Sequence, residues 1–141
     1  MQIVRPGDIE DALRVDVSTI LSGMGVSAAC FAPPAPDNLQ PNSVCFMATG
    51  GTRVPPVAYS HGVRVDCWAA TDAAAMELAN TVCGIIGAIM FYDTASVYPT
   101  SDVNIPYLNP DPNRPTLPRA SFNANVLMRG DSITETFKTK G

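Results

Sequence analysis

The clearest pattern in the chain is an alternation of apolar and polar residues over two segments. Between Arg119 and Arg129, every second residue is apolar, beginning at Ala120 and ending at Met128. A second alternation runs from Val57 to Trp68. A period of two is that of a strand with one buried face. The patterns therefore predict two long strands, and the Val57–Trp68 strand is expected to lie at the centre of the sheet.

Two other segments have the spacing of amphipathic helices. From about Asp8 to Leu21, apolar residues recur every three or four positions, after Pro6-Gly7 and before Gly23. The second helix is expected to start after Thr71, whose hydroxyl suits an N-cap. Its apolar stripe consists of Ala75, Leu78, Val82, Ile85 and Ile89. This helix is expected to pack on the strand face that carries Val63 and Val65.

The remaining segments are shorter or irregular. A strand is predicted at Val44–Thr49, ending at Gly50-Gly51, and a short strand or irregular edge at Asp93–Asn104. Residues 131–141 are polar and are expected to fray as a C-terminal tail. Strands follow one another without intervening helices in the first half, which favours an α+β fold in a single domain, residues 1–130. We expect one mixed, mostly antiparallel sheet with two main helices packed on one face, and proline-rich loops.

Composition limits the partners of the chain. The 141 residues are 46% hydrophobic and 16% charged, which suggests that a partner covers some apolar surface. The net charge of -4 argues against specific nucleic-acid binding, although DNA could pass close by. The acidic start does not resemble a signal peptide, and the longest apolar run, Val82 to Tyr92, is shorter than the roughly 20 residues of a membrane helix. We therefore expect no membrane partner and synthesis in the cytoplasm.

The residues that could carry chemistry are few. The only histidine, His61, lies six residues from Cys67 on one predicted strand, roughly 20 Å apart, which is beyond proton-transfer range. His61 paired with Cys30 or Cys45 leaves a small cysteine-dependent enzyme as a remote alternative. The cysteines lack the close spacing of metal ligands, and Gly50-Gly51 lacks the rest of a phosphate-binding loop. The prediction is therefore no enzyme, no metal and no cofactor.

The loop from Tyr107 to Pro118 contains four prolines and is expected to be stiff without regular structure. A stiff loop beside a sheet is suited to contacts with another molecule, and we expect this loop to reach a neighbouring subunit. The residues assigned to this interface are Asp111, Pro112, Arg114 and Arg119. The acidic helix start at Asp8, Glu10 and Asp11 is the complementary surface that we expect on the neighbour.

Three stretches carry a resemblance to a known family. They are the run Val63–Ala79, the run Asn109–Phe122 and the strand end Val126–Gly130. Together they resemble the tail terminator proteins of long-tailed bacteriophages, in which a long strand ends in a Trp-Ala-x-Thr-type turn before an alanine-rich helix. A Pro-Asp-Pro loop then precedes a strand that begins with Arg and an aromatic residue. The positions that match the pattern are Trp68, Thr71, Asp111, Pro112, Arg119 and Phe122.

The resemblance implies a structural protein of the virion. Members form a ring, usually a hexamer, that caps the head-proximal end of the tail tube and stops its growth. The implied partners are further copies of the chain, the tail-tube protein and the head-tail connector or stopper protein. The implied location is the tail and neck of the virion, after assembly in the host cytoplasm. A connector or stopper protein of the same neck is the alternative, and the matching residues Trp68, Thr71 and Phe122 are structural in either case.

Overall fold

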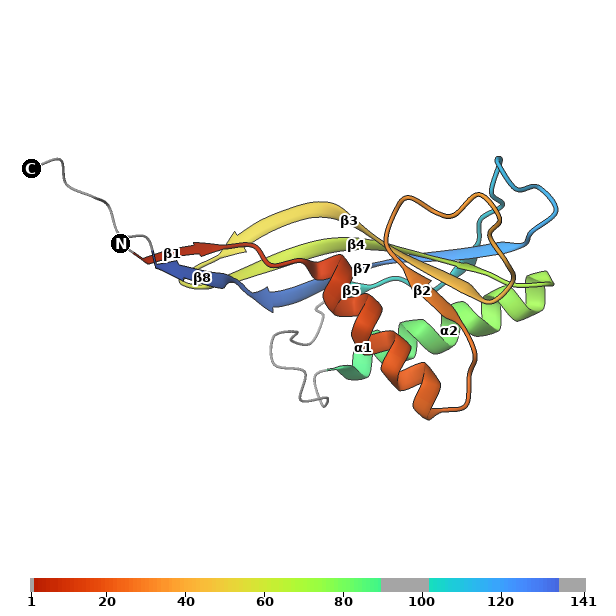
Figure 1. Cartoon of the computed structure of the whole chain (residues 1–141), viewed down its shortest axis with the longest axis horizontal. Helices are drawn as coiled ribbons and strands as arrows, with labels where there is room; N and C mark the ends of the chain where they lie inside the picture. The colour runs from red at the N-terminus through yellow and green to blue at the C-terminus, as the bar shows by residue number, and fades with distance from the viewer. Residues whose placement is uncertain (1, 90–101, 135–141) are drawn as a thin grey trace, which may run out of the picture.

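The computed structural model describes residues 2–89 and 102–134, which form two helices and eight strands (Figure 1). The helices are α1 (Ile9–Gly23) and α2 (Asp72–Ala88). The strands are β1 (Gln2–Arg5), β2 (Ala29–Phe31), β3 (Ser43–Val54), β4 (Ala58–Trp68), β5 (Asp102–Val103), β6 (Tyr107–Leu108), β7 (Arg119–Arg129) and β8 (Asp131–Thr134). Most of the expected edge at Asp93–Asn104 lies outside the described residues, and its end forms β5.

The main sheet has the strand order β2-β3-β4-β7-β5, and β6 also pairs with β7. Only the β2-β3 pair is parallel among the described strands, so the sheet is mixed and mostly antiparallel. The long strand β4 lies at its centre, where Val65 stands opposite Phe46 of β3 and Phe122 of β7. The predicted fold class and the central position of β4 are confirmed.

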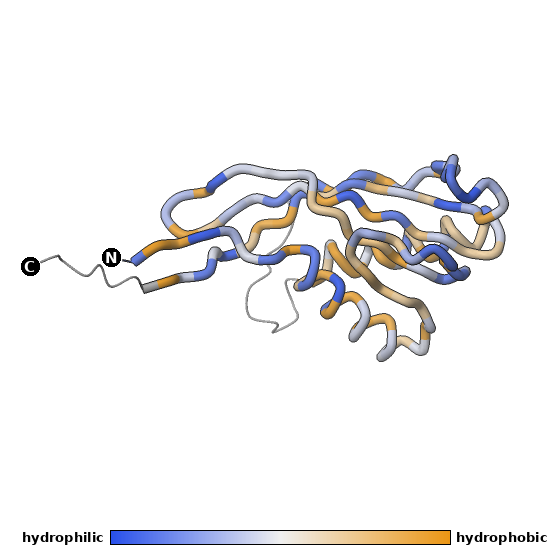
Figure 2. Tube along the Cα trace, turned by 45° about the horizontal axis from the view of Figure 1, so that its top comes forward, coloured by the Kyte–Doolittle hydropathy of each residue, from blue (hydrophilic) through white to orange (hydrophobic). Residues whose placement is uncertain are grey.

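Both helices cover the same face of this sheet (Figure 1). The core lies between the helices and the sheet. Phe46, Val65 and Phe122 are fully buried there, together with Leu13 of α1 and Val82 of α2. Hydrophobic positions recur at intervals along the strands and helices (Figure 2). The alternation in the sequence thus identified the face of the sheet that the helices cover.

Both helices begin at a side-chain cap, and the cap of α2 is the predicted Thr71. Asp8 accepts a hydrogen bond from the backbone N–H of Asp11 (3.0 Å), and Thr71 accepts one from Ala74 (3.1 Å). Each cap satisfies a backbone donor that has no partner within the first turn of its helix. Acidic residues also lie in both first turns, where the helix dipole favours negative charge.

Strand β3 does not end at Gly50-Gly51, as the sequence suggested, but continues to Val54. The two glycines have φ angles of 105° and 155°, and the pairing register with β4 shifts between Ala48 and Gly50. A side chain at Gly51 would collide with the carbonyl oxygen of Ser60. The glycines therefore form a bulge that lets the strand continue rather than a turn that stops it.

Strands β1 and β8 form a separate two-stranded antiparallel sheet that the sequence analysis missed. The prediction of a fraying tail is therefore wrong for residues 131–134, while 135–141 lie outside the described residues. Two bonds attach this ribbon to the β3–β4 hairpin. Tyr59 donates its hydroxyl to the Val4 carbonyl (3.0 Å), and the Gly130 N–H donates to the Val57 carbonyl (2.7 Å). We call residues 2–5, 49–60 and 128–134 the arm, which projects beyond the helices (Figure 1).

Candidate functional site

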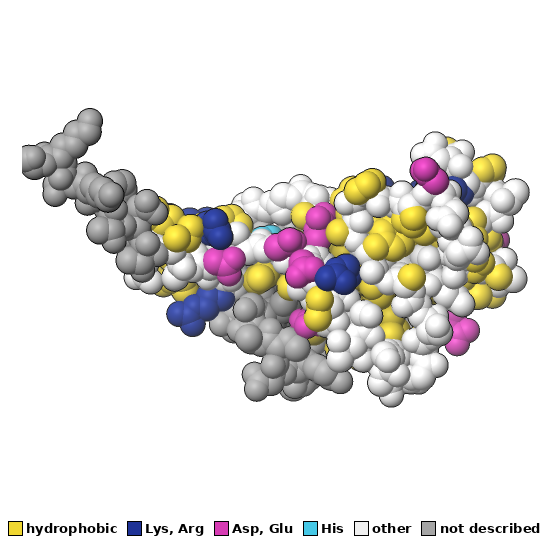
Figure 3. Space-filling view, viewed as in Figure 1, with side chains coloured by type: hydrophobic (Ala, Val, Ile, Leu, Met, Phe, Trp, Pro, Cys, Tyr) yellow, Lys and Arg dark blue, Asp and Glu magenta, His cyan; other side chains and the backbone are white. Residues whose placement is uncertain are grey.

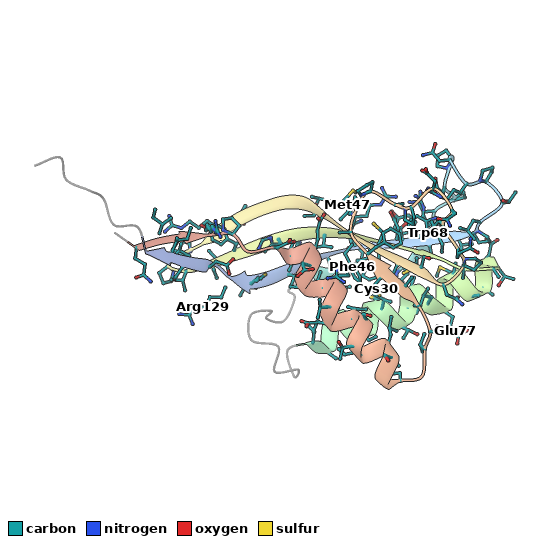
Figure 4. All side chains as sticks on the ribbon, viewed as in Figure 1. Cys30, Phe46, Met47, Trp68, Glu77 and Arg129 are labelled. Carbon is teal, nitrogen blue, oxygen red and sulfur yellow. The ribbon has the colours of Figure 1, made fainter. Side chains whose placement is uncertain are left out.

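The sheet face opposite the helices carries Trp68, the first residue of the terminator-like motif. It is 3% exposed and stacks on Phe31 of β2, with ring centroids 6.1 Å apart. The guanidinium of Arg119 lies 5.9 Å from the centroid of the Trp68 ring. Trp68 is therefore buried, but it lies outside the core cluster beneath the helices. Figure 4 shows its position on the ribbon.

Asp111, in the proline-rich loop, joins this loop to the indole of Trp68 by a hydrogen bond. The carboxylate is 4% exposed and accepts hydrogen bonds from Trp68 Nε1 (3.3 Å), Arg114 Nη1 (3.2 Å) and the Asn113 N–H (2.9 Å). Burial by itself would raise the pKa of Asp111, but these three donors and the charge of Arg119 hold that pKa below its usual value. Asp111 thus organises the loop as an ionised, buried group.

Arg119 connects the loop to a second buried carboxylate. Its guanidinium donates to the backbone carbonyls of Asn109 (2.7 Å) and Pro110 (3.3 Å), and lies 4.0 Å from Asp66 Oδ2. Asp66 also accepts hydrogen bonds from Ser121 Oγ (2.5 Å) and Arg64 Nε (3.0 Å). Because each buried charge here has an opposite charge and hydrogen bonds, this network holds the loop against the sheet.

The residues predicted to contact a neighbouring subunit mostly make contacts within the chain. Arg114 also donates to the Pro36 carbonyl (3.1 Å), which joins the two proline-rich loops, whereas Pro112 is exposed. The network therefore accounts for Asp111, Arg114 and Arg119 without a neighbour. Their role in a subunit interface stays a prediction that the single chain does not test.

The acidic start of α1, proposed as the complementary surface, is also engaged within the chain. Asp8 caps the helix and Asp11 pairs with Arg14 at 2.6 Å. Glu10 accepts a hydrogen bond from the Ala48 N–H of β3 (2.8 Å). Since both proposed partners are already bonded, a contact between this patch and the loop of another copy would have to compete with these bonds.

Two of the cysteines, Cys45 and Cys67, are buried, and Cys30 and Cys83 are half-buried. Burial raises the pKa of Cys30 to about 11 and that of Cys45 to about 12, and it raises the pKa values of Cys67 and Cys83 as well. Reactive cysteines need the opposite shift, because the thiolate is the nucleophile. The raised pKa values give no support to the cysteine-dependent enzyme that the sequence left open.

His61 is the only described residue with a buried side-chain nitrogen or oxygen that lacks a hydrogen-bond partner. Its side chain is 9% exposed, the unpaired atom is Nε2, and burial lowers its pKa. Beside it lies a hollow of about 320 Å³ at the base of the arm, lined by Pro6, Ala48, Gly50, Gly51, Thr52, Arg53, Tyr59, Ser60 and His61. No described thiol or carboxylate lines this hollow, so it offers no cysteine nucleophile for His61 to activate and no carboxylate to orient the imidazole.

Residues 2–89 and 102–134 contain no group of three His, Cys, Asp or Glu side chains that could hold a metal ion. Within the same ranges, no helix is both long enough and apolar enough to cross a membrane.

The chain was also compared with known proteins. Neither the scan against protein-family models nor the search of curated proteins found a match.

Proposed function

We propose that this protein is a structural subunit that assembles with copies of itself into a ring at the head-proximal end of a phage tail. There it would end the growth of the tail tube and join the tail to the head connector. The motif around Trp68, Thr71, Asp111 and Phe122 supports the proposal by its resemblance to tail terminators. The mixed sheet with two helices on one face agrees with the fold that the resemblance implies.

The main structural support for the proposal is the arm. It consists of a hairpin and a two-stranded ribbon, and such small units are marginally stable in isolation. Ile3 and Val54 on the arm are 38% and 39% exposed, so it has apolar surface left to bury. A projecting element of this kind gains stability when it packs on a partner, which favours a role in assembly.

The shape of the molecule favours a head-to-tail arrangement. The arm forms one end of the long axis, and the start of α2 with the proline-rich loops forms the other end (Figure 1). Contacts between two different surfaces are heterologous. They close into a ring when the rotation from one subunit to the next is a whole fraction of 360°. The proposed ring has six copies, as in the terminators that the motif resembles.

The test is to add purified protein to polymerising tail-tube protein encoded beside it and to measure tube length by electron microscopy. A terminator shortens and caps the tubes, with extra density at one end. A protein that leaves tube length unchanged but binds the head connector is instead a stopper, the alternative within the neck. If neither partner binds, the assignment to the phage neck is wrong.

A further inference from the structure

The arginines of the arm differ from all other described arginines. Arg14, Arg64, Arg114 and Arg119 each form an ion pair within the chain. Arg5, Arg53 and Arg129, which we call the arm arginines, are exposed and have no ion pair or side-chain hydrogen bond to any described residue. The arm contains one acidic residue, Asp131, within its described ranges. It is therefore a basic element of a protein whose net charge is -4.

The far part of the molecule carries the opposite charge. Asp37 of the β2–β3 loop and Asp72 and Glu77 of α2 are exposed, and their carboxylates have no ion pair or side-chain hydrogen bond in the described chain. We call these three residues the acidic end. Glu77 and Arg129 lie toward opposite ends of the long axis (Figure 4). Between these ends, the visible surface carries further acidic side chains with a basic side chain beside them (Figure 3).

A hollow lies beside one of these carboxylates. It has a volume of about 300 Å³ and is lined by Val26, Ser27, Asn42, Ala74, Glu77, Leu78 and Thr81. An arm that places an arginine near Glu77 could also bury apolar surface in this hollow. The acidic end thus offers both charge and shape to an incoming basic arm.

We propose that the arm of one subunit docks on the acidic end of the next copy of this chain. The inference rests on the proposed ring and names the two surfaces that would form its heterologous contact. The arm arginines and the carboxylates of the acidic end have no ion pair with any described residue, and their charges are complementary between successive copies. Since each subunit has one arm and one acidic end, the contact can repeat around a ring without leaving a surface unused.

Nucleic acid is a poorer fit to the arm arginines than a second copy. Arg53 stands opposite Tyr59, and Arg129 stands opposite the adjacent residue Ala58, so the two side chains leave opposite faces of the sheet. A phosphate backbone is recognised by a continuous basic surface, which these opposed positions do not form. The excess of acidic residues in the rest of the chain would also repel a polyanion.

The experiment is a charge exchange between two variants of the full chain. The arm variant carries Arg5→Glu, Arg53→Glu and Arg129→Glu, and the acidic-end variant carries Asp37→Lys and Glu77→Lys. Asp72 is kept because it lies in the first turn of α2, where its charge stabilises the helix. Assembly is followed by analytical ultracentrifugation at about 10 mM and about 1 M ionic strength, where the screening lengths are about 30 Å and 3 Å.

Each variant alone is expected to assemble at least about tenfold more weakly than wild type at low ionic strength, because both of its ends then carry the same sign of charge. Mixed in equal amounts, the two variants are expected to assemble again, since each reversed arm meets a reversed acidic end. High ionic strength should weaken both the wild-type and the mixed assemblies. A control with Arg→Lys at the same three arm positions keeps the charge and should assemble like wild type.

The outcomes separate this inference from the proposed function. A wild-type protein that stays monomeric overturns the ring and the docking together. If wild type assembles and both variants assemble equally well, the ring stands and the arm docking is wrong. If the mixture of variants fails to assemble while both remain folded by circular dichroism, the acidic end is not the partner of the arm.

Two checks complete the test. Should the Glu substitutions unfold the arm, Arg→Gln is introduced at the same three arm positions instead. These substitutions remove the charge without reversing it and should still weaken assembly. Binding of a duplex DNA oligonucleotide by wild type, lost in the arm variant while assembly is unchanged, would identify nucleic acid as the ligand and overturn the proposal.

Discussion

Replacing Asp111 by Asn should destabilise the protein by about 2–3 kcal/mol at neutral pH. The carboxylate is 4% exposed, and its Oδ2 atom accepts from Trp68 and Arg114 while lying 3.9 Å from Arg119. Removing one member of a buried ion pair costs about 3–5 kcal/mol. The lower figure applies here because Arg119 keeps Asp66 and two backbone acceptors, and Arg114 is partly exposed. For a chain of this size the loss corresponds to about 5–12 °C in Tm.

The same variant should show a distinctive dependence on pH. The folded-state pKa of Asp111 lies below its unfolded value, so its ionised form stabilises the fold above the unfolded pKa of about 3.9. That stability is lost as the pH falls through the folded pKa. The stability gap between wild type and Asp111→Asn, measured by urea unfolding, should therefore be full at pH 7 and shrink in strong acid. The control Asp37→Asn changes an exposed carboxylate and should unfold like wild type. An Asp111→Asn variant with wild-type stability at pH 7 would refute the role of this network.

Three further substitutions test other parts of the structure, and each is measured by urea or thermal unfolding. Thr71→Ala removes the hydroxyl that caps α2 and should cost about 1 kcal/mol, whereas Thr71→Ser should cost little; equal losses would contradict the cap. Because burial lowers the pKa of His61, the unfolded chain binds a proton first as the pH falls below about 6.5, and wild type should lose stability there. His61→Leu should remove that part of the pH dependence, and an unchanged slope would show that another group causes it. Gly51→Ala should destabilise by about 2 kcal/mol or more, since its side chain meets the Ser60 carbonyl, whereas Gly23→Ala has open space and should be tolerated.

The elements that the sequence revealed are those with a long, one-sided pattern of burial. Strand β7 runs from Arg119 to Arg129 as predicted, because every second side chain from Ala120 to Met128 is buried. Helices α1 and α2 were found from their apolar stripes, and the start of α2 also from its cap at Thr71. These signals are local, so they can be recognised without knowledge of the rest of the fold.

The arm was missed because its signals are short or depend on distant partners. Gln2–Arg5 has four residues, and its partner Asp131–Thr134 lies about 130 positions further along the chain. Gly50-Gly51 looks like a turn, and only the pairing with Gly62 and His61 shows that it is a bulge. Composition does not predict such pairings, since each depends on which strands the tertiary structure brings together.

The contacts that the candidate site makes within the chain were missed for a related reason. Arg114 and Arg119 in a stiff loop suggested contacts with another subunit, but Asp111 and the Pro36 carbonyl bind them within the chain. The partners of Asp111 include Trp68, which is 43 residues away in the sequence. The exposed arginines without an ion pair to any described residue are on the arm, and this could be recognised only after every other arginine had been placed.

The central claim is that this chain closes into a ring, and native mass spectrometry of the full-length protein at low ionic strength tests it most directly. One subunit has a mass of 14.9 kDa, and the account predicts one dominant species with six times that mass, alone or with tail-tube protein present. A broad ladder of masses would indicate open-ended association instead of a closed ring. A species of 14.9 kDa under both conditions would contradict the account.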